Sequence, residues 1–167
     1  MLVGALALLA AGCGSQASGP AVTPAVADAS RVDMCTILTD AELTGLGIDV
    51  DSRKQVNRLG LLGCGFQGRA ITLDLERDTE PLGSYRARRH GPAFTSFGDD
   101  TVNGRAGAHF SVDRERDDCT QLIDGGPVSL WVAVAPAFNP HGPPVDSCAE
   151  ALRIARMIEP RLPKAGN

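Results

Sequence analysis

Several stretches of the chain alternate apolar and polar residues, which is the pattern of a strand with one buried face. Ile71, Leu73 and Leu75, for example, share one side of an extended segment. The short segment Cys64-Gly65-Phe66 leads into this stretch and predicts a hairpin that turns near Gly68. The predicted strands are residues 64–66, 70–76, 106–112, 119–123 and 128–135.

Turn residues separate these stretches. Asn103-Gly104 lies between two candidate strands and is the strongest short-range signal for a hairpin. Asp124-Gly125-Gly126 predicts a second turn, between residues 119–123 and 128–135.

Three segments have helical features. Thr39 and Glu42 form a capping-box pattern that predicts a helix over residues 40–46. Residues 84–90 are expected to form one short helix, and residues 145–162 have the helical period, with Pro160 ending or kinking that helix. We therefore expect a single α+β domain: an antiparallel sheet of about five strands, with helices packed on one face.

The N-terminus has the pattern of an export signal. Residues 2–12 are apolar, too short to span a bilayer as a helix, and are followed by Cys13 and a small, polar segment. This predicts a signal peptide over residues 1–12, a lipidated Cys13, a flexible tether over 13–30 and a folded domain over 31–165. Two readings remain open, an ordinary cleaved signal with an incidental cysteine and a fragment of a membrane anchor. Ala10 stands where lipoprotein signals usually have Leu, and residues 1–12 lack basic side chains.

Cys13 aside, the chain has four cysteines, Cys35, Cys64, Cys119 and Cys148. An even number in an exported domain indicates disulfides, with three possible pairings. We expect neighbours in sequence to pair, Cys35 with Cys64 and Cys119 with Cys148. A zinc site is the competing interpretation, and it is disfavoured because the chain has no C-x-x-C and no paired cysteine–histidine motif.

Charge and composition exclude some function classes. The formal net charge is −4 and the pI about 5.3, whereas nucleic-acid binding requires a basic surface. Aromatic residues are scarce, which disfavours a carbohydrate-binding face. The chain has no G-x-S-x-G or H-E-x-x-H motif and no cofactor fingerprint. We therefore expect a protein without cofactor or metal that is not an enzyme, although a triad assembled from distant residues stays open.

One basic cluster stands out in this acidic chain. Arg86, Arg89 and His90 are spaced so that they share one face of a helix. They are the candidate anion-binding residues, and the competing reading is a solvated helix face. Asp113, Glu115 and Asp117 lie on one side of a charged segment that is a weaker candidate for calcium, or simply a charged edge.

Three motifs in the chain resemble those of a known family. Residues 32–39 (VDMCTILT) resemble its opening "D-x-C-x-L-L-T", and Cys64-Gly65-Phe66 resembles its "C-x-W", with Phe in place of Trp. Residues 148–155 with Leu162-Pro163 resemble its closing helix. The chain is thus similar to actinobacterial lipoproteins of the domain-of-unknown-function family 3558. The resemblance implies an envelope lipoprotein and supplies no catalytic residues.

Together these observations predict a lipid-anchored protein on the outer face of the cytoplasmic membrane. Its partners are the membrane, through the N-terminal anchor, and an envelope protein or a small ligand. The leading hypothesis is a non-catalytic binding or sensing module. A purely structural lipoprotein and an extracytoplasmic hydrolase are the alternatives.

Overall fold

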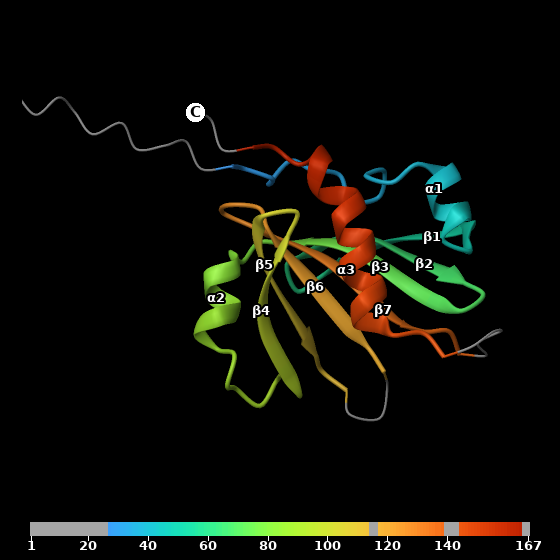
Figure 1. Cartoon of the computed structure of the whole chain (residues 1–167). Helices are drawn as coiled ribbons and strands as arrows, with labels where there is room; N and C mark the ends of the chain where they lie inside the picture. The colour runs from blue at the N-terminus through green and yellow to red at the C-terminus, as the bar shows by residue number, and fades with distance from the viewer. Residues whose placement is uncertain (1–26, 114–116, 139–143, 165–167) are drawn as a thin grey trace, which may run out of the picture.

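In a computed structural model, described over residues 27–113, 117–138 and 144–164, the alternating segments pair into one sheet. The sheet has seven strands in the order β1-β2-β3-β7-β6-β5-β4, and all neighbours are antiparallel (Figure 1). The strands are β1 (Ile48–Arg58), β2 (Leu61–Gly68), β3 (Ile71–Asp78), β4 (Ser96–Val102), β5 (Arg105–Ser111), β6 (Cys119–Asp124) and β7 (Ser129–Pro136). The helices are α1 (Asp40–Gly45), α2 (Leu82–Ala87) and α3 (Ser147–Ile158), followed by the short 3-10 helix η1 (Glu159–Arg161).

The single antiparallel domain is confirmed, but the expected number of about five strands is wrong. The strand missed entirely is β1, and β4 was implied only as the first arm of the Asn-Gly hairpin. Both are edge strands, and their sequences, IDVDSRKQVNR and SFGDDTV, are rich in charged and polar residues. An edge strand pairs on one side only and is commonly charged to discourage aggregation, so it lacks the alternation that identifies a central strand.

The predicted turns are confirmed. The β4–β5 hairpin turns at Asn103 and Gly104, whose φ angles are 51° and 89°. Two successive residues with positive φ give the type I′ turn that Asn-Gly favours. Likewise β2 ends at Gly68 and β3 begins at Ile71, so this hairpin turns where the sequence indicates.

The capping box at α1 is formed as predicted. The Thr39 hydroxyl accepts from the Glu42 N–H at 3.3 Å, and the Glu42 carboxylate accepts from the Thr39 N–H at 2.9 Å. Arg161 also binds Glu42, and together these hydrogen bonds lower the pKa of Glu42 from its ordinary value of 4.5 to about 2. The helix predicted over 145–162 is α3, which spans Ser147–Ile158, and it ends before Pro160 as expected, because proline cannot continue an α-helix; Pro160 lies in η1.

Helices cover both faces of the sheet, so the expectation that they pack on one face is wrong. Helix α3 lies across β6 and β7, where Ile154 and Ile158 join an aliphatic core with Leu73 and Val132 (Figure 1). Helix α2 packs on the opposite face. Side chains alternate along each strand, so the strand residues that contact α2 point away from α3. This second core contains Leu82, Tyr85, Ala108, Phe110 and Leu122. We call the two surfaces the α3 face and the α2 face.

Both disulfides lie on the α3 face, and both have the predicted pairing. Cys35 is joined to Cys64 of β2, and Cys119 of β6 is joined to Cys148 of α3. The folded part starts earlier than the predicted residue 31, because Ala29 is fully buried and its N–H donates to Gly125 at 2.9 Å.

Candidate functional site

The segment of residues 31–35 crosses the α3 face beside the ends of β1, β2 and β3. Met34 anchors it in the core with 1% of its surface exposed. The Asp33 carboxylate accepts from the Cys35 N–H and from the Thr36 hydroxyl, each at 2.9 Å. Together with the disulfide between Cys35 and Cys64, these contacts hold the segment against the sheet.

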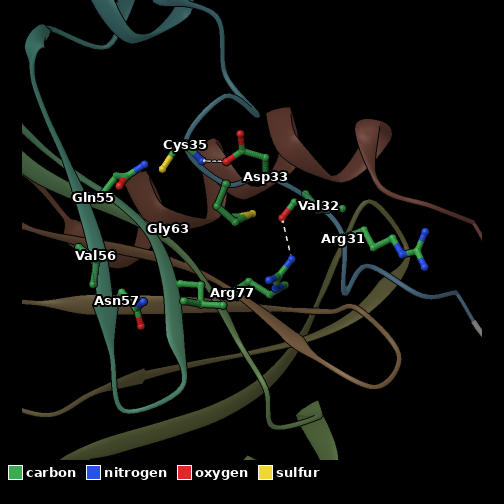
Figure 2. A pocket seen from close by; sticks show the side chains of 11 residues that line it. Arg31, Val32, Asp33, Cys35, Gln55, Val56, Asn57, Gly63 and Arg77 are labelled. Carbon is green, nitrogen blue, oxygen red and sulfur yellow. Dashed lines mark hydrogen bonds between the residues drawn. The ribbon is translucent and has the colours of Figure 1, made fainter.

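A groove lies between this segment and the strands, and we call it the N-terminal groove. It has a volume of about 340 Å³, within the range of small-ligand sites. Figure 2 shows the segment along one wall and β1 along the other, with Arg77 between them. The lining residues are Arg31, Val32, Asp33, Met34, Cys35, Gln55, Val56, Asn57, Leu62, Gly63 and Arg77.

Arg77 is the most informative residue of the groove. It is half-buried, and its Nη1 donates to the Val32 carbonyl at 3.1 Å (Figure 2). The two other half-buried arginines of the described chain have carboxylate partners, Arg86 with Asp99 at 2.6 Å and Arg105 with Glu159 at 3.0 Å. Among the described residues Arg77 has no such partner. Because charges removed from water are normally paired, Arg77 has the capacity to bind an anion.

The opposite wall adds neutral hydrogen-bonding groups. Gln55 and Asn57 stand two apart on β1, so both side chains point to the same face of the sheet. Neither amide group, nor the exposed Arg31 guanidinium, makes a hydrogen bond within the described chain. Asp33 is the only carboxylate among the lining residues, and both its oxygens bind the segment itself. The groove is therefore rich in free donors.

The predicted anion-binding residues have a different arrangement from the expected one. Helix α2 ends at Ala87, so Arg89 and His90 lie beyond it and do not share a helical face with Arg86. The Arg86 guanidinium binds Asp99 and the Gly107 carbonyl, and Arg89 Nε lies 3.2 Å from His90 Nε2. The prediction that they bind an anion is untested.

Other predictions also await a test. Cys13 and the signal peptide lie outside the described residues. In the part of the chain that is described, no helix combines the length and the apolar content needed to cross a bilayer. No group of three or more His, Cys, Asp or Glu side chains there is arranged to hold a metal ion.

Sequence reasoning missed Arg77, although a signal was present. The alternation of Ile71, Leu73 and Leu75 continues to position 77, where it predicts another residue on the core face. An arginine at a core-facing position of a strand is unusual, because removing a charge from water is costly unless it is paired, and it therefore indicates a candidate site residue. The role of Gln55 and Asn57 had no such signal, because β1 itself was not predicted.

Comparison with known proteins adds the family but no activity. Residues 8–161 match the profile of a family described as a protein of unknown function, DUF3558. No curated protein and no solved structure matches the chain. Since the matched region spans most of the sequence, the chain belongs to this family of unknown function, DUF3558.

Proposed function

We propose that this protein is a non-catalytic binding module of the cell envelope, held on the outer face of the cytoplasmic membrane by a lipid on Cys13. Two disulfides in a domain of this size support an oxidising, extracytoplasmic compartment. The apolar segment before Cys13 supports the anchor.

In this proposal the N-terminal groove is the ligand site, and the ligand carries a carboxylate or a phosphate. The observation that carries the assignment is the half-buried Arg77 guanidinium, which has no carboxylate partner among the described residues. Its planar fork suits both anions, and Gln55 and Asn57 can donate to neighbouring ligand oxygens. The groove follows directly on the predicted tether, so the ligand would bind at the end of the domain nearest the anchor.

Arginine-detected NMR titration of the purified chain tests this function, with inorganic phosphate and glycylglycine as separate probes. We expect saturable shifts of the Arg77 Nε–H signal with at least one probe. Arg77→Gln should weaken binding roughly tenfold or more, because it removes a charge-assisted pair. Arg89→Gln is the matched control, since Arg89 is an exposed arginine outside the groove.

Two results would contradict the assignment. If Arg86→Glu with Arg89→Glu abolished binding and Arg77→Gln did not, the anion site would be the basic cluster at the end of α2. If no variant and no probe gave a saturable shift, the purely structural role would replace the binding role. Turnover of an envelope substrate, lost on changing a single Ser, Asp or His, would establish the hydrolase instead.

A further inference from the structure

The α2 face gathers most of the aromatic residues of the chain. The sequence contains seven in total, and five of them cluster here: Tyr85, Phe94, Phe97, Phe110 and Trp131. Phe110 is the centre, with ring centroids 4.9 Å from Phe94 and 5.3 Å from Trp131. The cluster draws on α2, the loop after it and three strands.

This cluster opens to solvent through a cavity of about 320 Å³, which we call the aromatic pocket. Its floor consists of the aromatic rings, and its rim comes from the β1–β2 hairpin, the loop between β3 and α2, and Val112 directly after β5. The lining residues are Leu59, Leu61, Asp78, Thr79, Glu80, Tyr85, Arg88, Ala93, Phe94, Phe110, Val112 and Trp131.

Two large apolar side chains are exposed at the rim of the pocket. Large hydrophobic side chains are exposed at three described positions, Leu59 at 100%, Val112 at 56% and Phe138 at 92%. Leu59 and Val112 both border the aromatic pocket, although they are far apart in sequence. Leu59 also occupies a turn at φ 49°, where Gly, Asn or Asp is usual, so the turn does not explain the leucine. Apolar residues gathered around a cavity indicate a binding surface.

The charged side chains of the pocket make hydrogen bonds within the protein. Asp78 accepts from the Tyr85 hydroxyl and from the Glu80 N–H, and Glu80 binds Arg88. The Arg88 guanidinium lies 4.4 Å from the centroid of the Tyr85 ring. Burial and the bond to Asp78 raise the pKa of Tyr85, so its hydroxyl remains a neutral donor to Asp78. The pocket therefore presents aromatic and aliphatic surface beside the buried Asp78 carboxylate, whose donors, the Tyr85 hydroxyl and the Glu80 N–H, are neutral.

We propose that the aromatic pocket binds a hydrocarbon chain, the acyl chain of a fatty acid or of a membrane lipid. A polar or charged small molecule would need converging hydrogen-bond partners, and here the charged side chains are already engaged. The volume lies at the lower end of ligand pockets, which suits a narrow chain. The exposed Leu59 and Val112 cover the chain where it leaves the pocket, and its head group remains in water.

Trp131 makes this proposal directly measurable, because it is the only tryptophan of the chain and lines the pocket. Bromine quenches tryptophan emission at near contact. We expect ω-bromoundecanoic acid to quench Trp131 saturably in the purified full-length chain, and unbrominated undecanoic acid to compete. A second arm uses phosphatidylglycerol vesicles with brominated acyl chains. Quenching in the first arm alone identifies the free acid as the source, and quenching by the vesicles identifies the membrane lipid.

Leu59→Ser with Val112→Ser should raise the dissociation constant obtained from the quenching titration roughly tenfold. The melting temperature should stay nearly unchanged, because both side chains are exposed. Phe138→Ser is the matched control, since Phe138 is exposed but does not line the pocket. Arg77→Gln should leave quenching unaltered, which separates this site from the N-terminal groove. The absence of saturable quenching in both arms, or equal affinity in the double variant, would overturn the proposal.

Discussion

The two faces of the sheet differ in how completely they are closed. The α3 face is covered by α3 and the N-terminal segment over an aliphatic core, and both disulfides lie there. The α2 face is covered by a helix of six residues and the loop that follows it. Its core is aromatic, it opens through the aromatic pocket, and it contains the buried carboxylates of Glu76 and Asp78.

This difference indicates a division of roles. A fully packed aliphatic core and covalent crosslinks stabilise the fold, and they leave little room for a ligand except at the edge, where the N-terminal groove lies. Because the α3 face holds the sheet together, the opposite face can retain a half-open cluster and buried charge. The comparison predicts that stability depends mainly on the α3 face, and three measurements address it.

The largest effect is expected from the disulfides. Each spans 29 residues, so in the chain-entropy model each contributes about 3–4 kcal/mol to the free energy of unfolding. Replacing Cys35 and Cys64 by Ala should therefore cost about as much as replacing Cys119 and Cys148. Denaturant unfolding measures both. Only the first pair borders the N-terminal groove, so it alone should also weaken anion binding. Equal loss of binding in both variants would mean that the groove depends on global stability.

Core truncations should separate the faces more directly. Leu73→Ala removes a fully buried side chain from the α3 face and should cost about 3 kcal/mol. Phe94→Ala on the α2 face removes a larger but half-exposed ring and should cost only about 1–2 kcal/mol. The two unfolding free energies at the same temperature are the test. A greater loss for Phe94→Ala would show that the aromatic cluster carries the fold, contrary to the comparison.

The smallest effect is an opposite pH dependence of one carboxyl group on each side. Glu42 has its pKa lowered by hydrogen bonds from Arg161 and Thr39, so its stabilisation is present above pH 4.5 and is lost as the pH falls toward about 2. Burial, followed by the nearby Asp74 charge, raises the pKa of Glu76. The folded protein then holds this proton more tightly than the unfolded chain, and stability falls as the pH rises above 4.5 through the raised pKa.

Melting temperatures across the pH range distinguish the two groups. Glu42→Gln should remove part of the decrease in melting temperature below pH 4.5, and Glu76→Gln part of the decrease above it. The half-buried Glu80 is not suitable as a control because it binds Arg88. Asp51→Asn is suitable, since it changes an exposed carboxyl group without an ion pair in the described chain. Identical pH profiles of the melting temperature for Glu76→Gln and Asp51→Asn would show that the buried Glu76 carboxyl group does not contribute to the pH dependence of stability.

Much of the local structure was predictable because it depends on neighbours in sequence. The capping box at Thr39 and the Asn103-Gly104 turn each need only a few adjacent residues. The central strand β3 was predictable because one side of it is buried, which imposes alternation. The edge strand β1 was not, because its alternation is confined to a few residues at its start, is followed by a polar run, and is interrupted by a register shift between Asp49 and Lys54.

The candidate sites were less predictable than the fold. The expected cluster of Arg86, Arg89 and His90 assumed a helix that in fact ends at Ala87. The sequence shows that aromatic residues are few, but their number does not reveal that most of the rings lie in one cluster. The number of aromatic residues does not depend on where they lie, whereas a binding site requires that their side chains meet in the folded chain.

The sequence by itself determined the central strands, the turns and the presence of disulfides, because hydrophobic period, turn chemistry and the number of cysteines can be read along the chain. Only the tertiary structure decided which side chains meet. The order β3-β7-β6-β5 brings Trp131 between the Glu76 and Leu122 strands and beside Phe110, and the path of residues 31–35 places Arg31 near Arg77. The hairpins follow from local turns, but the pairing of β3 with β7 joins segments distant in sequence, and no local pattern encodes it.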